Sequence, residues 1–349
     1  GGRETQYGYN PDGHLILVTD NLGGEVAYER DEVGNIVGRT DPNDHTTRYT
    51  YDLAGNTTAE ILPTGERTDM TYDLMGRRLN TTDAAGRTIA LTYDPLGRVI
   101  RREAPDDDVE QTTWWPSGRR LSVQDQSGET RFSWNENGYL IRRTDPDGIE
   151  TRYTWDSSGN LTEREGPDGV FTWTYDALNR PTEVRGPEGL QIQLGYHPSG
   201  RLGSRGHANG VVQTWSYDAN GRLIATETRG ADGSLIAGYT YVIAAGGERT
   251  QLQETHRNHT VDYAYDGLRR LTEERHADGV VIGYAYDAAG NRTGVDHSAE
   301  GISNATYDDA NRILTRGDAR YAYDDAGQLA SMEDGSITRF QFDARGRLR

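Results

Sequence analysis

Cysteine and lysine are both missing from this 349-residue sequence. Without cysteine, neither a disulfide nor a thiolate metal site can form. All 37 basic residues are therefore Arg, a side chain that forms bidentate hydrogen bonds with carboxylates and stacks on aromatic rings. No apolar run approaches the ~18 residues of a membrane-spanning helix, so we expect no membrane span.

Apolar residues are also scarce, at 34% of the chain, whereas globular chains usually carry about 45–50%. Phe occurs four times but Tyr 21 times, and a Tyr ring can pack while its hydroxyl stays hydrogen-bonded. This supply is too small for a thick two-layer core. It predicts a thin sheet with one aromatic face, or a sheet wrapped around a space.

The net charge of -18 argues against a nucleic-acid partner, because phosphate binding requires a basic patch. The first residues, Gly1 to Thr5, show no signal peptide. They read as the middle of a repeat, so we expect this chain to be a piece of a longer protein.

A short motif recurs along the whole chain: an aromatic residue, Asp, two variable residues and Gly. We call the aromatic position the anchor. Clear copies of the motif place anchor, Asp and Gly at Tyr51, Asp52 and Gly55; Tyr72, Asp73 and Gly76; Tyr93, Asp94 and Gly97; Tyr217, Asp218 and Gly221; and Tyr286, Asp287 and Gly290. We predict structural roles for these residues.

Anchors fall at 9, 30, 51, 72, 93, 114, 134, 155, 175, 196, 217, 265, 286, 307, 323 and 342, mostly 20 or 21 residues apart. Residue 30 is Arg, so that copy is degenerate. The 48-residue gap between 217 and 265 predicts one further, degenerate repeat near Tyr241, within residues 229–264. The chain therefore holds about 17 units of about 21 residues.

The motif predicts a β-hairpin turn, which we call the anchor turn. Asp, two residues and Gly match a type I turn followed by a residue in the left-handed conformation, which Gly adopts freely. Asn179 and Asn311 replace this Gly, and Asn is the next best residue there. Arg269 occupies the same position, and the turn chemistry does not explain it.

Such a turn fixes which residues face each other across the hairpin. The Asp faces the residue after Gly, so Asp94 meets Arg98, and Asp218 and Asp343 meet Arg222 and Arg347. The anchor faces the second residue after Gly, which pairs Tyr93 with Val99, Trp155 with Leu161 and Tyr217 with Leu223.

A second turn lies between successive anchors, for example Asp145-Pro146-Asp147-Gly148. Each repeat is then two strands of about seven residues, and no segment carries a helical pattern. The predicted fold is all-β: tandem Tyr-Asp (YD) β-hairpin repeats in a curved or spiral sheet, a partial shell or cocoon. We find no linker or change in composition, which predicts one continuous domain over residues 1–349, with no separate catalytic domain.

These in-register copies resemble the Rhs (YD-repeat) family, which includes bacterial polymorphic toxins, the C components of toxin complexes and the YD shell of teneurins. The resemblance covers essentially the whole chain. It implies a spiral β-sheet around a chamber, and in the bacterial members a C-terminal toxin domain inside it. Two family features are absent from the sequence: an apolar plug segment, and the Asp-Pro-x-Gly-Leu motif at which self-cleavage occurs. The resemblance therefore does not imply self-cleavage for this chain.

Other polar groups have a simple structural explanation. Asp106, Asp107 and Asp108, or Asp145, Asp147 and Glu150, could contribute to a Ca²⁺ site, but such a site needs more oxygen ligands at fixed spacing, which favours solvated turns. His256 and His259 lack a third metal ligand, and on a strand their spacing would place them on opposite faces. Regularly spaced aromatic rings could stack on sugars, although packing within the sheet is favoured.

We therefore predict a non-enzymatic shell segment of an Rhs-type toxin that encapsulates and helps to deliver a toxin domain outside this chain. The alternative is an extracellular adhesion or carbohydrate-binding module. We expect no catalytic residue, no metal and no cofactor. The expected partners are the enclosed toxin domain and secretion-system components, and the expected location is outside the producing bacterial cell.

Overall fold

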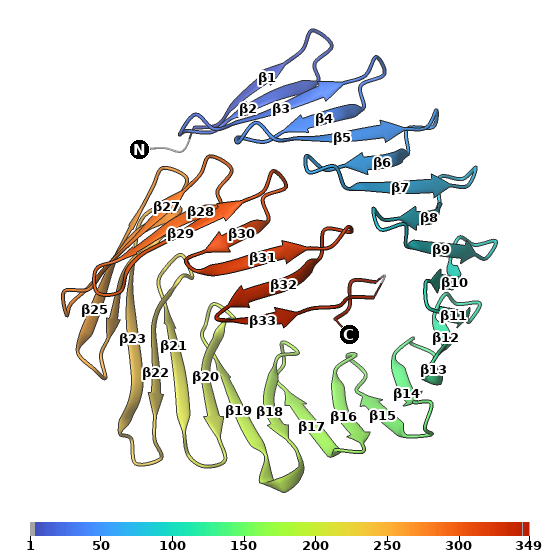
Figure 1. Cartoon of the computed structure of the whole chain (residues 1–349). Coiled ribbons are helices and arrows are strands. Elements are labelled where there is room, and N and C mark those ends of the chain that lie inside the picture. The colour runs from blue at the N-terminus through green and yellow to red at the C-terminus, as the bar shows by residue number, and fades with distance from the viewer. Residues whose placement is uncertain (1–3, 344, 349) are drawn as a thin grey trace. The chain divides into compact units, whose positions relative to one another are not determined.

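The computed structural model describes residues 4–343 and 345–348, which are almost entirely β-strand and turn (Figure 1). The 33 strands belong to an antiparallel sheet, and a single 3-10 turn, Pro187–Gly189, is the one helical element in these residues. The all-β prediction is confirmed, and the strand number is close to the 34 that about 17 two-stranded repeats require.

The chain forms two compact units. Unit 1 comprises residues 1–109, 264–275 and 279–349, and unit 2 comprises residues 110–263 and 276–278.

Most strands of unit 1 come from the two ends of the chain. They are β1 (Gln6–Tyr9), β2 (Leu15–Thr19), β3 (Glu25–Arg30), β4 (Ile36–Thr40), β5 (Thr46–Tyr51), β6 (Thr57–Ile61), β7 (Arg67–Tyr72), β8 (Arg78–Thr82), β9 (Thr88–Tyr93), β10 (Val99–Ala104), β26 (Leu271–His276), β27 (Val281–Tyr286), β28 (Arg292–His297), β29 (Gly301–Tyr307), β30 (Ile313–Arg316), β31 (Ala319–Tyr323), β32 (Leu329–Asp334) and β33 (Ser336–Arg339).

The strands of unit 2 are consecutive, and its first and last strands extend across the boundary with unit 1. They are β11 (Asp108–Trp114), β12 (Arg120–Asp125), β13 (Gly128–Trp134), β14 (Leu140–Thr144), β15 (Glu150–Trp155), β16 (Leu161–Gly166), β17 (Gly169–Tyr175), β18 (Pro181–Arg185), β19 (Gln191–Tyr196), β20 (Leu202–His207), β21 (Val212–Tyr217), β22 (Leu223–Arg229), β23 (Leu235–Ile243), β24 (Arg249–Glu254) and β25 (His259–Tyr265).

Sequence neighbours pair throughout each unit, as β5 does with β4 and β6. Each anchor up to Tyr323 is the last residue of its strand, and the register shifts beside it, as at Tyr93. This bulge follows from the three-residue turn. Phe342 instead forms an isolated bridge with Leu348. The predicted pairs Tyr93–Val99, Trp155–Leu161 and Tyr217–Leu223 are confirmed.

The sheet has almost no buried core in the described residues. The buried hydrophobic residues are small or branched, namely Ala59, Ala104, Val261 and Ala319, and no large side chain there is fully buried. This agrees with the low apolar content. Most anchors are only half-buried and Tyr9 is 60% exposed, so contacts between successive repeats must contribute what a core would otherwise supply.

Candidate functional site

The anchor turn satisfies its own backbone through the Asp side chain. Oδ1 of Asp73 accepts the backbone N–H groups of Met75 at 2.9 Å and of Arg77 at 3.0 Å. These bonds stabilise the ionised carboxyl: the backbone N–H of Arg77, and then its side chain, lower the pKa of Asp73. Equivalent Oδ1 bonds are made by Asp52, Asp94, Asp218 and Asp287.

The fourth turn position takes the left-handed conformation in every clear copy. Its φ is 83°, 74°, 80°, 76° and 97° at Gly55, Gly76, Gly97, Gly221 and Gly290. Asn179 and Asn311 have φ of 60° and 62°, as expected, and Arg269 reaches 66°. Arg269 thus adopts the same strained conformation without the advantage of Gly or Asn.

The anchors join each repeat to the one before it. The hydroxyl of Tyr93 donates a hydrogen bond of 2.7 Å to the carbonyl of Arg78, which faces the preceding anchor, Tyr72. Trp anchors do the same through Nε1, as Trp155 does to Leu140 at 2.7 Å. Further anchors that make this bond are Tyr51, Tyr72, Trp134, Tyr175, Tyr196, Tyr217, Tyr286, Tyr307 and Tyr323.

The Arg that follows the fourth turn position makes a second link between repeats. Arg77 binds Asp73 Oδ2 through Nε at 2.6 Å, and its guanidinium lies over the ring of Tyr93 in the next repeat, 4.8 Å from the centroid. The same stacking occurs at Arg180–Tyr196, Arg201–Tyr217, Arg270–Tyr286 and Arg312–Tyr323. We call the anchor bonds and these Arg contacts the ladder.

The degenerate repeat lies two residues beyond the position expected from the sequence. Its anchor is Ile243, which pairs with Arg249 beside a register shift. Ala244 takes the place of Asp, and Gly247 has φ of 99°. In regular repeats the Arg also donates to the carbonyl at the Asp position of the next repeat, as Arg77 does to Asp94 at 3.3 Å. Arg222 makes this bond to Ala244 at 2.7 Å, so the contact persists although both motif side chains are lost.

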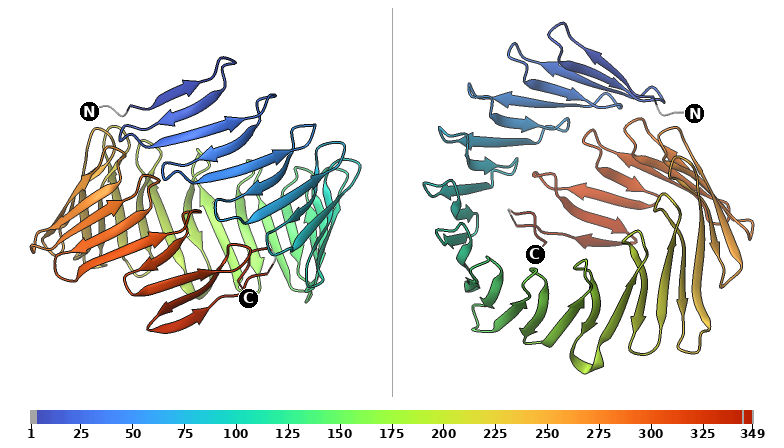
Figure 2. Two further views of the ribbon diagram at one scale, coloured as in Figure 1. Left: turned by 45° about the horizontal axis from the view of Figure 1, so that its top comes forward. Right: turned by 180° about the vertical axis from the view of Figure 1, so that it is seen from behind.

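Unit 1 contains contacts between residues far apart in the sequence, which we call the seam (Figure 2). In the seam, second turns within residues 20–108 meet anchor turns within residues 266–347. Asn43 Nδ2 donates to Asp287 Oδ2 at 3.0 Å, and Arg312 Nη2 lies 2.8 Å from Glu66 Oε1. Other seam pairs are Asn21–Gly267, Asp41–Asn311, Arg87–Gln328 and Asp108–Arg345.

The seam also holds a titratable cluster. His45 Nε2 lies 3.3 Å from Asp309 Oδ1, and His45 Nδ1 lies 3.8 Å from Asp41 Oδ2. Arg39, Pro63 and Asn311 are among the residues that line a cavity of about 180 Å³ around these groups. These groups bring polar side chains from the two sides of the seam within 4 Å of each other.

The acidic turns considered for Ca²⁺ have other partners. Asp145 lies 2.6 Å from Arg143, Glu150 lies 2.8 Å from Arg152, and Asp108 lies 2.6 Å from Arg345. His256 and His259 do not meet: His256 lies in the turn after β24, and His259 Nε2 lies 3.2 Å from Nδ1 of His276. Within residues 4–343 and 345–348, no group of three potential ligands could hold a metal ion.

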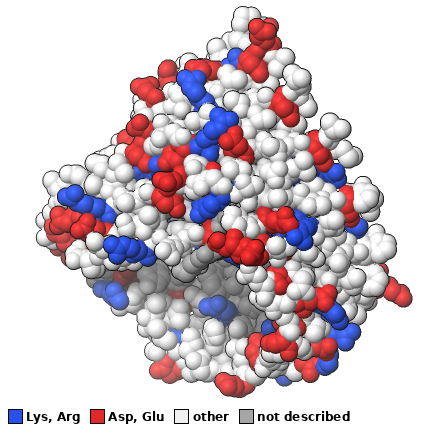
Figure 3. Space-filling model, turned by 45° about the vertical axis from the view of Figure 1, so that its right-hand side comes forward, with Lys and Arg blue, Asp and Glu red and all other residues white. Residues whose placement is uncertain are grey.

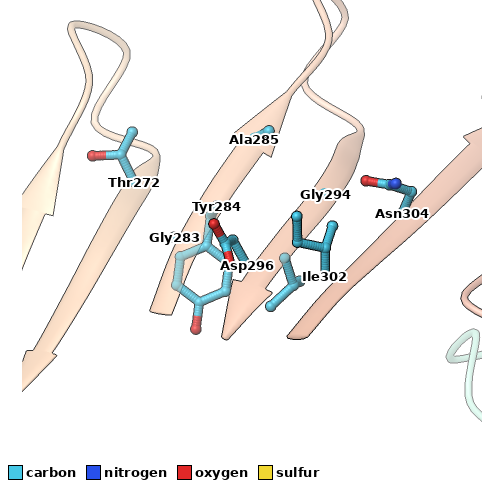
Figure 4. A pocket seen from close by; sticks show the side chains of 9 residues that line it. Thr272, Gly283, Tyr284, Ala285, Gly294, Asp296, Ile302 and Asn304 are labelled. Carbon is cyan, nitrogen blue, oxygen red and sulfur yellow. The ribbon is translucent and has the colours of Figure 1, made fainter. Parts of the chain in front are cut away.

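A cavity of about 310 Å³ lies on β27, β28 and β29 (Figure 4). Gly283, Ala285 and Gly294 leave the space open, and Asp296 and Asn304 border it. Its ionisable groups are the carboxyl of Asp296 and the hydroxyl of Tyr284, which donates to Glu274 Oε1 at 2.7 Å. Burial and this hydrogen bond raise the pKa of Tyr284 to about 12, which makes its hydroxyl poorly suited to acid–base catalysis near neutral pH.

Sequence reasoning missed the anchor hydroxyl bond and the seam. A signal for the first was present, because the preference for Tyr over Phe requires a use for the hydroxyl. The seam pairs side chains at separations of 237 to 270 residues, which a local motif cannot reveal. On the face drawn in Figure 3, acidic and basic side chains lie interspersed, consistent with the many Arg–carboxylate pairs.

Comparisons with known proteins agree with this architecture. The teneurin YD-shell family model matches residues 38–232 and 247–349, and the RHS repeat model matches residues 9–46. None of the helices in the described residues is long and apolar enough to cross a membrane.

The curated relatives are far longer than this chain. A double-stranded DNA deaminase toxin A of Burkholderia cenocepacia is 27% identical over 240 residues, 63% of this chain and 15% of that protein. A probable deoxyribonuclease RhsA of Dickeya dadantii is 28% identical over 48% of this chain and 12% of that protein.

Solved structures of toxin complexes share the fold. The Tc holotoxin pore of Photorhabdus luminescens aligns with a TM-score of 0.78 at 18% identity, covering 99% of this chain and 22% of that one. The TcdB2-TccC3 complex aligns with a TM-score of 0.69 at 17% identity, covering 99% and 25%.

Proposed function

Because this chain belongs to the teneurin YD-shell family, we propose that it is a structural shell segment of an Rhs-type toxin. The shell encapsulates and helps to deliver a C-terminal toxin domain outside this chain. One observation carries the proposal: the repeated Asp, Arg and Tyr side chains are engaged in turns and in the ladder. A chain whose repeated polar groups hold the sheet together is suited to containment.

The relatives support a separate cargo. They are named as a deaminase toxin, a deoxyribonuclease and a tRNA nuclease, and this chain spans only 15%, 12% and 4% of them. One repeat region thus accompanies different named activities. In this proposal the chain itself catalyses nothing, binds no cofactor and acts on no nucleic acid.

The proposal extends to organisation and location. Residues 1–349 form one continuous array in which the anchor, Asp and Gly positions are structural, and the two units are parts of that array. The partners are the enclosed toxin domain and components of a secretion system. The assembled protein is delivered out of a bacterial cell.

The ladder argues against the carbohydrate-binding alternative. A sugar-binding ring needs an exposed face and a hydroxyl free to meet solvent or ligand. Tyr196 instead has its hydroxyl bonded to the carbonyl of Pro181 and the guanidinium of Arg180 4.3 Å from its centroid. A ring whose hydroxyl and one face are already occupied contributes to packing between repeats and is a poor surface for stacking on a sugar.

The test uses the full-length parent protein. In the assembled protein we expect the C-terminal domain to resist protease and to show no toxic activity. The same domain should be active when it is purified alone. Replacing both Tyr93 and Tyr217 by Ala should make that domain protease-sensitive without changing its activity when isolated. Toxicity of the 349-residue array alone, or a C-terminal domain that is equally accessible in both forms, would contradict the proposal.

A further inference from the structure

Two second turns of unit 1 reach across the seam from the same position. In one of them, Arg87 binds Asp83 of its own turn through Nε at 2.7 Å and donates through Nη2 to Gln328 Oε1 at 3.3 Å on the far side of the seam. In the other, His45 follows Asp41 by four residues, as Arg87 follows Asp83. The seam therefore has a permanently charged side chain at one of these positions and a titratable side chain at the other.

Each ring nitrogen of His45 lies beside a carboxylate. Nε2 is 3.3 Å from Oδ1 of Asp309 on the far side of the seam, and Nδ1 is 3.8 Å from Oδ2 of Asp41 in its own turn. A neutral imidazole carries a proton on only one of its two nitrogens, so the lone pair of the other would face a carboxylate oxygen. Only the imidazolium ion presents an N–H to both carboxylates.

The closed seam holds Asp41 away from water. Asp41 is 8% exposed, and its Oδ2 accepts a hydrogen bond of 2.9 Å from Asn311 Nδ2 across the seam. His45 Nδ1 is also buried, and it has no hydrogen-bond partner among the residues that the structure describes. A buried carboxylate is costly unless an opposite charge lies beside it. Protonation of His45 supplies that charge where the seam closes over Asp41.

The other charged groups on the elements packed around His45 are already paired or are exposed. Arg312 pairs with Asp308 at 2.7 Å and with Glu66 at 2.8 Å. The remaining groups are Arg39, which lines the same cavity, and Asp44, both exposed, and Asp287, whose Oδ2 accepts Nδ2 of Asn43 and of Asn291. Water screens the exposed charges, so Asp41 and Asp309 dominate the surroundings of the ring.

We propose that His45 makes this part of the seam pH-sensitive: its imidazolium holds the two sides together at mildly acidic pH, and the neutral ring loosens them at higher pH. Because the protonated ring is the form that fits the closed seam, this stabilisation is full below the pKa of an unperturbed histidine, about 6.5, and is lost as pH rises beyond it. It also requires ionised carboxylates, so it fades again below about pH 4.

The loosening is local. Arg87 and Arg312 keep their charge throughout this range of pH, so their contacts with Gln328 and Glu66 persist when His45 is neutral. The seam thus responds to pH at one turn and stays closed at the turns that follow.

The test is hydrogen exchange at the backbone N–H of Ala289, which donates to Asn43 Oδ1 at 3.2 Å across the seam. Between about pH 5.5 and about pH 8, we expect wild-type protection to fall about two- to fivefold after correction for the intrinsic rate, the size expected for a partly exposed ion pair. His45→Arg should keep the higher protection at both pH values. His45→Gln should show the lower protection at both.

Two further variants make the test specific, and circular dichroism verifies that each variant is folded. Asp309→Asn removes the partner of His45 across the seam and should abolish the dependence on pH. Arg87→Gln is the matched control: it weakens a contact that is charged at both pH values, so exchange around Gln328 should rise equally at both.

Three results would overturn the proposal. One is wild-type protection of Ala289 that is constant over this range or rises with pH. Another is a dependence on pH that persists in His45→Gln or His45→Arg, because it would then come from a different group. The third is an unchanged dependence in Asp309→Asn, and this variant decides the question if a substitution of His45 prevents folding.

Discussion

Arg77 and Tyr93 join two successive repeats: the guanidinium of Arg77 lies 4.8 Å from the ring centroid of Tyr93 while its Nε binds Asp73. Stacking of this kind contributes about 0.5–1 kcal/mol at exposed sites. In a double-mutant cycle with Arg77→Ala and Tyr93→Leu, we expect a coupling free energy of about that size from urea denaturation. Purely additive effects would mean that the contact carries no energy.

Two substitutions separate the contributions that the hydroxyl and the ring of Tyr93 make to stability. Tyr93→Phe removes the bond to Arg78 and should cost about 1 kcal/mol. Tyr93→Ala also removes the half-buried ring and should cost about 2 kcal/mol or more. Hydrogen exchange should rise chiefly in β7 to β10, because repeat arrays transmit damage to near neighbours. A uniform rise across the chain would contradict this local coupling.

The turn conformation at Gly97 makes a further prediction. With φ of 80°, this position should accept Asn at a small cost and Val only at about 1–3 kcal/mol more. Thermal unfolding of both variants measures the difference. Gly206→Ala is the control, since a methyl group there meets only the Gln193 side chain at 3.9 Å. Equal stability of the Asn and Val variants would disprove the left-handed assignment.

The carboxylates of the anchor turns predict that the fold loses stability at acidic pH. The side chain of Asn160, and then its backbone N–H, lower the pKa of Asp156, and the side chain and backbone of Arg180 do the same for Asp176. A carboxyl whose folded pKa is depressed stabilises the fold above its unfolded value of about 3.9 and loses this effect as pH falls through the folded pKa. Denaturation midpoints should therefore drop steeply below about pH 4. Asp156→Asn should flatten that drop, and an unchanged profile would speak against the turn carboxylate.

The seam ion pair predicts unequal costs for two similar substitutions. Arg312 and Glu66 are each only 19% exposed. Arg312→Ala should cost about 1–3 kcal/mol because it leaves both Glu66 and Asp308 without a charge partner and removes the stacking on Tyr323. Arg185 is 64% exposed beside Glu183, so Arg185→Ala should cost under about 1 kcal/mol. Hydrogen exchange around residues 62–66 should increase in the first variant alone.

The local hairpin was predictable because each of its parts has its own residue type. Asp, Gly and the anchor recur together, so turn type, bulge and register follow from Asp94, Gly97 and Tyr93. The degenerate repeat was harder, because Ile243 and Ala244 retain the backbone geometry without the motif. The seam was not predictable, since Asn43 and Asp287 meet only once many intervening hairpins have formed.

The Ile243 repeat has a mechanical consequence. Hairpins connected in series share an applied load, and Tyr and Trp anchors such as Tyr93 and Trp155 tie their hairpins to the preceding one through a polar tip. Ile243 has no such tip, and Ala244 cannot brace its turn with a carboxylate. When the chain is pulled from its ends, this hairpin is therefore where the array yields first, so a force that leaves the repeats around Tyr93 intact would open the sheet near residue 243.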